Sequence, residues 1–81
     1  MSTYLTEDEK RRFEGLLMSL ALQKRDSYKI NGEYVPTQII LNRIMLLQTS
    51  EIVEVFRKMR ETEVKNYFVY LVTALYNAYE V

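Results

Sequence analysis

The fold is decided by residues 64–80, which read VKNYFVYLVTALYNAYE. Some apolar side chains of this stretch recur at helical spacing, and others extend the apolar surface beyond one stripe. The spaced residues are Phe68, Leu71, Val72, Leu75 and Tyr79, and the additional ones are Tyr67, Val69, Ala74 and Ala78. A helix with apolar residues on nearly every side is either buried centrally or covered by a partner.

A first helix is predicted near the start of the chain. Thr6 and Glu9 have the spacing of a capping box, in which a hydroxyl and a carboxylate satisfy backbone donors of the first turn. The apolar stripe that follows predicts a helix to about Gln23, and it consists of Phe13, Leu16, Leu17 and Leu20. Gly15 inside this helix indicates that another element approaches closely, because an exposed mid-helix glycine costs about 1 kcal/mol relative to alanine.

A β-hairpin is predicted next. The dipeptide Asn31-Gly32 fits the two positive φ angles of a type I′ turn between short strands. An isolated pair of such strands is marginal in water, so the hairpin must lean on the helices through Tyr28, Ile30 or Val35.

A second helix is predicted from Pro36 to about Leu47, because proline is favoured at the first helical position. Its core stripe is Ile40, Leu41, Ile44 and Leu47. Three more apolar residues, Ile39, Met45 and Leu46, lie outside this stripe. Either another element of the chain covers them or they form a contact surface.

A third helix is predicted after Ser50, which is a good N-cap, and it ends near Glu61. Glu54 and Lys58 have the i, i+4 spacing of a favourable ion pair on its surface. The residues with helical apolar spacing are Ile52, Val55, Phe56 and Met59.

Asn66 caps a fourth predicted helix, which continues to about Tyr79. The sequence therefore predicts a mainly α fold over residues 1–81. This fold is a compact single domain of four helices, with a short β-hairpin between the first and second helices.

The composition argues against catalysis. The chain has no histidine and no cysteine, so it lacks the usual general base, the commonest metal ligand and any thiolate ligand. Its glycines cannot form a phosphate-binding loop. We expect a non-enzymatic protein with no metal, no cofactor and no small-molecule substrate.

No apolar run approaches the ~20 residues that span a bilayer, and the N-terminus has no apolar signal core, so we expect a cytoplasmic protein without membrane contact.

Charge and tyrosine content leave nucleic-acid binding and association open. Eleven basic residues balance eleven acidic ones, so contact with a polyanion has to come from local clusters. Neutrality also favours self-association. The chain holds seven tyrosines, whose rings can stack on bases but also suit the rim of a small helical core. On the last helix, Tyr70 and Asn77 belong to a polar strip that is either its wet side or a hydrogen-bonding surface.

Several small signatures follow one another through residues 32–78. They are Gly32-Glu33 before Pro36, Asn42-Arg43 in a helix that closes with two leucines, Ser50-x-Ile52 at a helix start, and Tyr70-Leu71-x-x-Ala74-Leu75-Tyr76-Asn77-Ala78. In this order they resemble the C-terminal domain of the replication initiator A proteins of Gram-positive plasmids and conjugative elements. That family looks DnaD-like, and DnaD-like domains are implicated in DNA binding and in helicase-loading assemblies.

The resemblance implies candidate DNA contacts. The DnaD pattern Tyr-x-x-x-Ile-x-x-x-Trp is loosely echoed by Tyr67, Leu71 and Leu75, although this chain has no tryptophan. Carried over, Tyr67 is a base-stacking residue and Lys65 a phosphate contact, whereas Leu71 belongs to the core.

Two functions follow as expectations. The first is a DNA-replication initiation module that binds DNA weakly, including single strands, or a helicase-loading protein of the replisome. Its candidate nucleic-acid contacts are Lys10, Arg11, Arg12, Arg57, Lys58, Arg60, Lys65 and Tyr67. The alternative is a protein-interaction or homodimerisation domain without direct DNA contact, with a partner interface of Ile39, Met45, Leu46, Tyr70 and Asn77. Convergence of the cations on one face favours DNA, and their dispersal among acids favours association.

Overall fold

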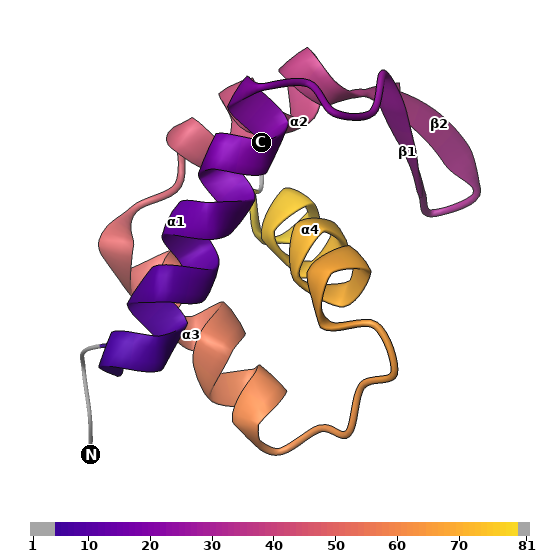
Figure 1. Ribbon diagram of the computed structural model, residues 1–81. Helices are drawn as coiled ribbons and strands as arrows, with labels where there is room; N and C mark the ends of the chain where they lie inside the picture. Colours follow the sequence, from indigo (N-terminus) through magenta and orange to yellow (C-terminus); the bar gives the residue numbers. More distant parts are fainter. Residues whose placement is uncertain (1–4, 80–81) are drawn as a thin grey trace.

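The computed structural model describes residues 5–79 and confirms the four helices with one hairpin between the first two. Figure 1 shows their arrangement. The elements are α1 (Glu7–Ala21), β1 (Ser27–Ile30), β2 (Glu33–Pro36), α2 (Thr37–Met45), α3 (Thr49–Arg60) and α4 (Tyr67–Ala78). No helix within this described part has the length and apolar character needed to cross a bilayer.

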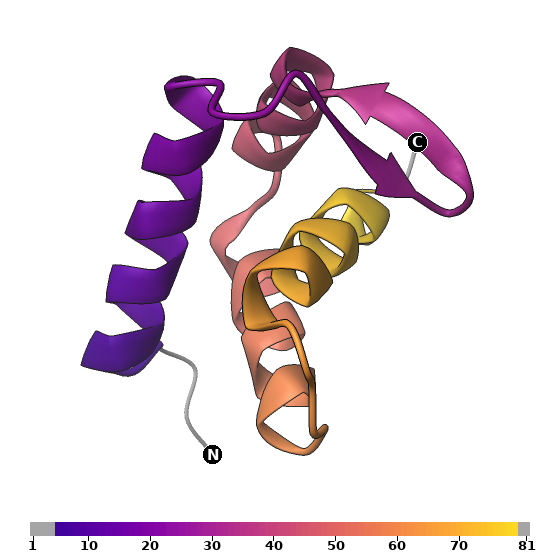
Figure 2. The same ribbon diagram turned by 45° about the vertical axis from the view of Figure 1, so that its right-hand side comes forward.

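Helix α4 lies between α1, α3 and the hairpin in both Figure 1 and Figure 2. Its side chains Leu71, Val72 and Leu75 are buried, as central burial requires. Val69 and Tyr70 remain 38% and 41% exposed, so one side of the helix faces solvent. The apolar excess of α4 is thus mostly, but not wholly, covered by the rest of the chain.

A single hydrophobic core joins all the elements. Phe56 of α3 is fully buried and meets Phe13 of α1 edge to face, with ring centroids 6.3 Å apart. The buried apolar residues are Leu16, Leu20, Tyr28, Ile30, Ile40, Ile44, Val55, Phe56, Met59, Leu71, Val72 and Leu75. Because every predicted stripe contributes to this list, apolar periodicity identified the inward faces correctly.

The hairpin has the predicted turn and leans on the helices as expected. Asn31 and Gly32 have φ values of 54° and 86°, and Ile30 pairs with Glu33 across the turn. Tyr28 is buried against Phe68 of α4, with ring centroids 6.0 Å apart. At the turn, the side-chain amides of Asn31 and Asn77 exchange hydrogen bonds of 2.8 and 3.3 Å, which fasten the hairpin tip to α4.

The prediction that Gly15 marks a close approach was wrong. Gly15 is exposed, and a Cβ atom built there has no neighbouring heavy atom within 4 Å. Helix α1 therefore carries the destabilising effect of a mid-helix glycine without a packing reason.

Two predictions at α3 were also wrong. The N-cap is Gln48 rather than Ser50, because the carboxylate of Glu51 reaches back to accept a hydrogen bond of 2.8 Å from the Gln48 backbone N–H. Glu54 pairs with Arg57 rather than with Lys58. The planar guanidinium donates two hydrogen bonds to that carboxylate, which an ammonium group cannot match in geometry.

Candidate interaction surfaces

An ion pair between Arg60 and Glu9 joins the end of α3 to the start of α1. Arg60 donates to both carboxylate oxygens of Glu9, with Nε 2.7 Å from Oε2. Glu9 is only 7% exposed and also accepts a hydrogen bond from the Thr6 backbone N–H. The hydrogen bonds from Arg60 lower the pKa of Glu9, although burial opposes this effect. Arg60 therefore joins α3 to α1.

Arg12 and Tyr67 form a second cluster beside this ion pair. Arg12 donates to Asp8 with Nε 2.8 Å from Oδ2, and its guanidinium carbon lies 4.2 Å from the centroid of the Tyr67 ring. Burial raises the pKa of Tyr67, and the charge of Arg12 opposes that shift. One face of the Tyr67 ring is thus covered by Arg12, which leaves less of the ring for stacking on a base.

The remaining predicted cations divide into paired and unpaired ones. Lys10 lies 3.6 Å from a carboxylate oxygen of Glu7, and Arg57 is paired with Glu54. The other three are exposed and have no ion pair within residues 5–79: Arg11, Lys58 and Lys65. The cations are therefore interspersed with acids, which is the arrangement that favours association over binding to a polyanion.

An apolar surface lies on α2. Ile39 is 51% exposed, Met45 67% and Leu46, which follows the last turn, 62%. No other element within residues 5–79 covers them. Of the two possibilities that the sequence left open, a contact surface is therefore the one that the described chain supports. We refer to these three residues with Asn42 between them as the α2 face.

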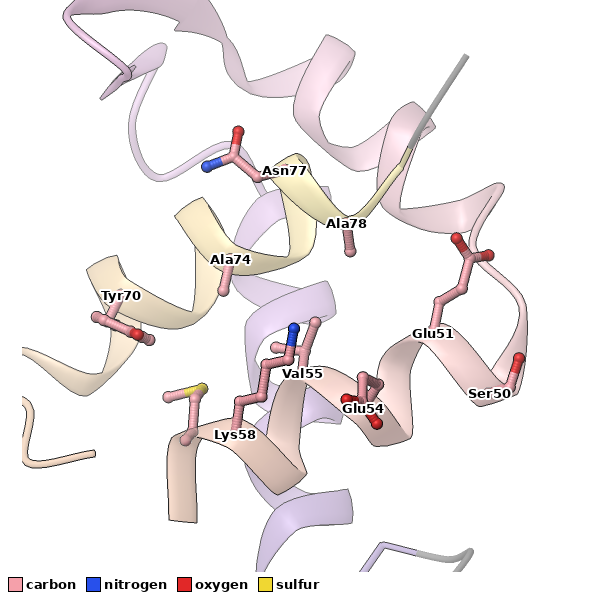
Figure 3. Close-up of a pocket in the computed structure, with 10 residues that line it drawn as sticks. Ser50, Glu51, Glu54, Val55, Lys58, Tyr70, Ala74, Asn77 and Ala78 are labelled. Carbon is pink, nitrogen blue, oxygen red and sulfur yellow. The ribbon is translucent and has the colours of Figure 1, made fainter. Parts of the chain in front are cut away.

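A groove of about 610 Å³ lies between α3 and α4. Figure 3 shows Ala74 and Ala78 of α4 pointing toward Val55 of α3, while Lys58 extends from α3 toward α4. Val55 and Met59 are the buried residues of its lining. The lining from α3 is Ser50, Glu51, Glu54, Val55, Lys58 and Met59, and that from α4 is Tyr70, Ala74, Asn77 and Ala78.

The groove exists because two small side chains stand one helical turn apart on α4. Ala74 and Ala78 leave space above Val55 that larger residues would fill. Tyr70 and Asn77, predicted as interface residues from the polar strip of α4, both line this groove. The five predicted interface residues are thus divided between two places, the groove and the α2 face.

Two contacts between distant elements were not predicted from the sequence. The ion pair of Glu9 with Arg60 joins residues far apart in the chain, so no local sequence pattern predicts it. Arg43 lies over the rings of Tyr76 and Tyr79, 4.3 and 5.4 Å from their centroids, and so links α2 to the end of α4. The spacing of Ala74 and Ala78 was a usable signal for the groove, because small residues at i, i+4 leave a shallow side on a helix.

Within residues 5–79, no group of three or more acidic, histidine or cysteine side chains is placed to hold a metal ion. Comparisons with protein-family models, curated proteins and solved structures find no match to this chain.

Proposed function

We propose that this chain is a non-enzymatic protein-interaction module in the initiation of DNA replication, and that it binds a segment of a helicase-loading protein in the groove between α3 and α4. The observation that carries the proposal is the groove itself, an apolar concavity with a charged rim, on a domain in which Arg12, Arg57 and Arg60 are paired with carboxylates. The replication context is supported by the resemblance of residues 32–78 to the initiator A proteins.

Charge supports a protein partner over DNA. The domain has no net charge, and Lys10, Arg12, Arg57 and Arg60 each lie within 4 Å of a carboxylate. A phosphate backbone would have to compete with those carboxylates for each cation, and salt would weaken what remained.

The groove suits an amphipathic helix. Such a helix would place apolar side chains above Val55 and between Ala74 and Ala78, in the manner of helix-in-groove recognition. Glu51 and Glu54 at one part of the rim favour basic side chains on the partner, and Lys58 favours an acidic one. Tyr70 is 41% exposed at the rim, and tyrosine is among the residues that contribute most to binding at interfaces.

The proposal is tested by biolayer interferometry with a purified replicative helicase and helicase loader from a Gram-positive bacterium as the two probes. We expect one of them to bind the full chain, and Tyr70→Ala to weaken that binding about tenfold or more. Tyr34→Ala is the matched control, because Tyr34 is 71% exposed on β2 and does not line the groove. Equal binding by both variants, or no binding of either probe, contradicts the proposal.

Weak DNA contact is the second candidate function. The observation that favours it is the exposure of Arg11, Lys58 and Lys65, which have no ion-pair partner within residues 5–79. Lys65 also precedes Tyr67 by two positions, so a phosphate contact and the free part of the tyrosine ring would be near each other in the chain.

A further inference from the structure

We propose that the α2 face is a homodimer interface, in which two copies of this chain pair about a two-fold axis. This inference does not rest on the groove, because α2 contributes no residue to the groove lining.

The apolar residues of the α2 face are suitably placed for such a contact. Ile39 and Leu46 are seven positions apart, which puts them nearly in line along the helix, and Met45 lies toward the other edge of the same exposed side. More than half of each side chain is exposed, so each has apolar area to bury against a partner. Asn42 lies between them on the helical projection.

The low charge of this segment favours a second copy as the partner. Residues 37–48 contain one charged residue, Arg43, and its guanidinium is directed to the rings of Tyr76 and Tyr79. A two-fold interface sets the same surface against itself, so any net charge on it would repel its own copy. An uncharged face avoids that repulsion, whereas it offers a strongly charged partner no complementary group.

The polar groups at this face are amides, which can pair with their own kind. Gln23 donates to Gln38 at 3.1 Å, and Gln38 donates to Asn42 Oδ1 at 2.9 Å. Within residues 5–79 the amide nitrogen of Asn42 donates no hydrogen bond, so it can donate to the oxygen of the second Asn42 across the axis. The reciprocal amide pair of Asn31 and Asn77 shows the same geometry inside this chain.

A dimer of this kind would be bivalent. Each copy would keep its own groove between α3 and α4, so two segments of an oligomeric partner could bind together with a gain in apparent affinity. The dimer does not depend on a helicase-loading protein in the groove, because the two surfaces share no residue.

The oligomeric state is tested by sedimentation velocity on the full chain over a concentration series that spans about 1 to 100 μM, the range in which a micromolar dimer forms. We expect the mass to rise from 9.7 kDa toward twice that value. Met45→Glu should keep the chain monomeric throughout, because each copy then brings a negative charge into an apolar contact. Met18→Glu is the matched control, since Met18 of α1 is exposed to nearly the same extent, 65% against 67%, and should leave the dimer intact.

The two-fold arrangement has a sharper test at its centre. Asn42→Asp and Asn42→Lys should each be monomeric alone, because like charges then meet at the axis, and an equimolar mixture should restore the dimer mass. Thermal melts by circular dichroism show whether each variant is folded. A wild-type chain that stays at 9.7 kDa across the series, or a dimer that Met45→Glu leaves unchanged, overturns the proposal.

Discussion

Glu9 and Arg60 lie 51 positions apart in the sequence, and the guanidinium of Arg60 donates to both carboxylate oxygens of Glu9. The same carboxylate accepts a hydrogen bond from the backbone N–H of Thr6, at the cap of α1. One buried side chain thereby closes the first turn of α1 and fixes it to the last turn of α3.

Stability should depend on pH through Glu9. Its pKa in the folded chain lies below the ordinary 4.5, mainly because of the hydrogen bonds from Arg60. The contribution of this carboxylate is therefore complete above about pH 5 and is lost as the pH falls through the lowered folded pKa. Urea denaturation at a series of pH values measures it as a fall in the free energy of unfolding on the acid side.

Glu9→Gln provides the control for that pH dependence. We expect this variant to lose about 1–2 kcal/mol at neutral pH, since the glutamine side chain has no negative charge and offers the charged guanidinium one acceptor oxygen in place of two; solvent at the exposed side of Arg60 limits the loss. Its acid-side slope should be shallower than that of the wild type. Parallel slopes in the two proteins would show that other carboxylates cause the whole effect.

Gly15→Ala should stabilise the domain by up to about 1 kcal/mol, because a Cβ atom meets nothing within 4 Å and alanine is the better helix former. The thermal midpoint from circular dichroism should rise by several degrees. A lower midpoint would mean that α1 needs a bare backbone at this position.

Gly32→Ala should destabilise the hairpin by about 1 kcal/mol, because φ at this position is +86° and an L side chain is strained there. Gly32→Asn is the matched variant, and it should lose less because asparagine tolerates positive φ. Thermal unfolding of the wild type and the two variants gives the order of their stabilities. If alanine and asparagine cost the same, the turn conformation is not the source of the loss.

Phe56→Ala should cost about 3–5 kcal/mol, since Phe56 is fully buried and packs against Phe13 at the centre of the core. Ile39→Ala should change the free energy of unfolding of the monomer by less than about 0.5 kcal/mol, because Ile39 is half exposed. Chemical denaturation at low protein concentration compares them without a contribution from association. Similar losses in both variants would contradict the assigned core.

The sequence predicted those parts of the structure that depend on neighbours in the chain. The Thr6–Glu9 capping box, the Asn31-Gly32 turn and the Asn66 cap were all predicted correctly, because each is a local hydrogen-bonding or backbone preference. The apolar stripes also located the core, since burial follows helical periodicity.

What the sequence could not supply are relationships between elements. The pairing of Arg60 with Glu9, the stacking of Arg12 on Tyr67 and the groove beside Ala74 depend on how helices cross, which periodicity does not encode. Even within α3, Glu54 had both Arg57 and Lys58 at helical spacing, and the geometry of the side chains decided in favour of Arg57.

The choice of a protein partner over DNA is tested most directly by a fluorescence-anisotropy titration of labelled single- and double-stranded DNA at about 50 and 200 mM salt, between which phosphate-driven binding differs steeply. We expect flat traces at both salt concentrations, because Arg12, Arg57 and Arg60 are already paired with carboxylates. Saturable binding at the lower salt that collapses at the higher salt would contradict the proposed function and favour direct DNA contact.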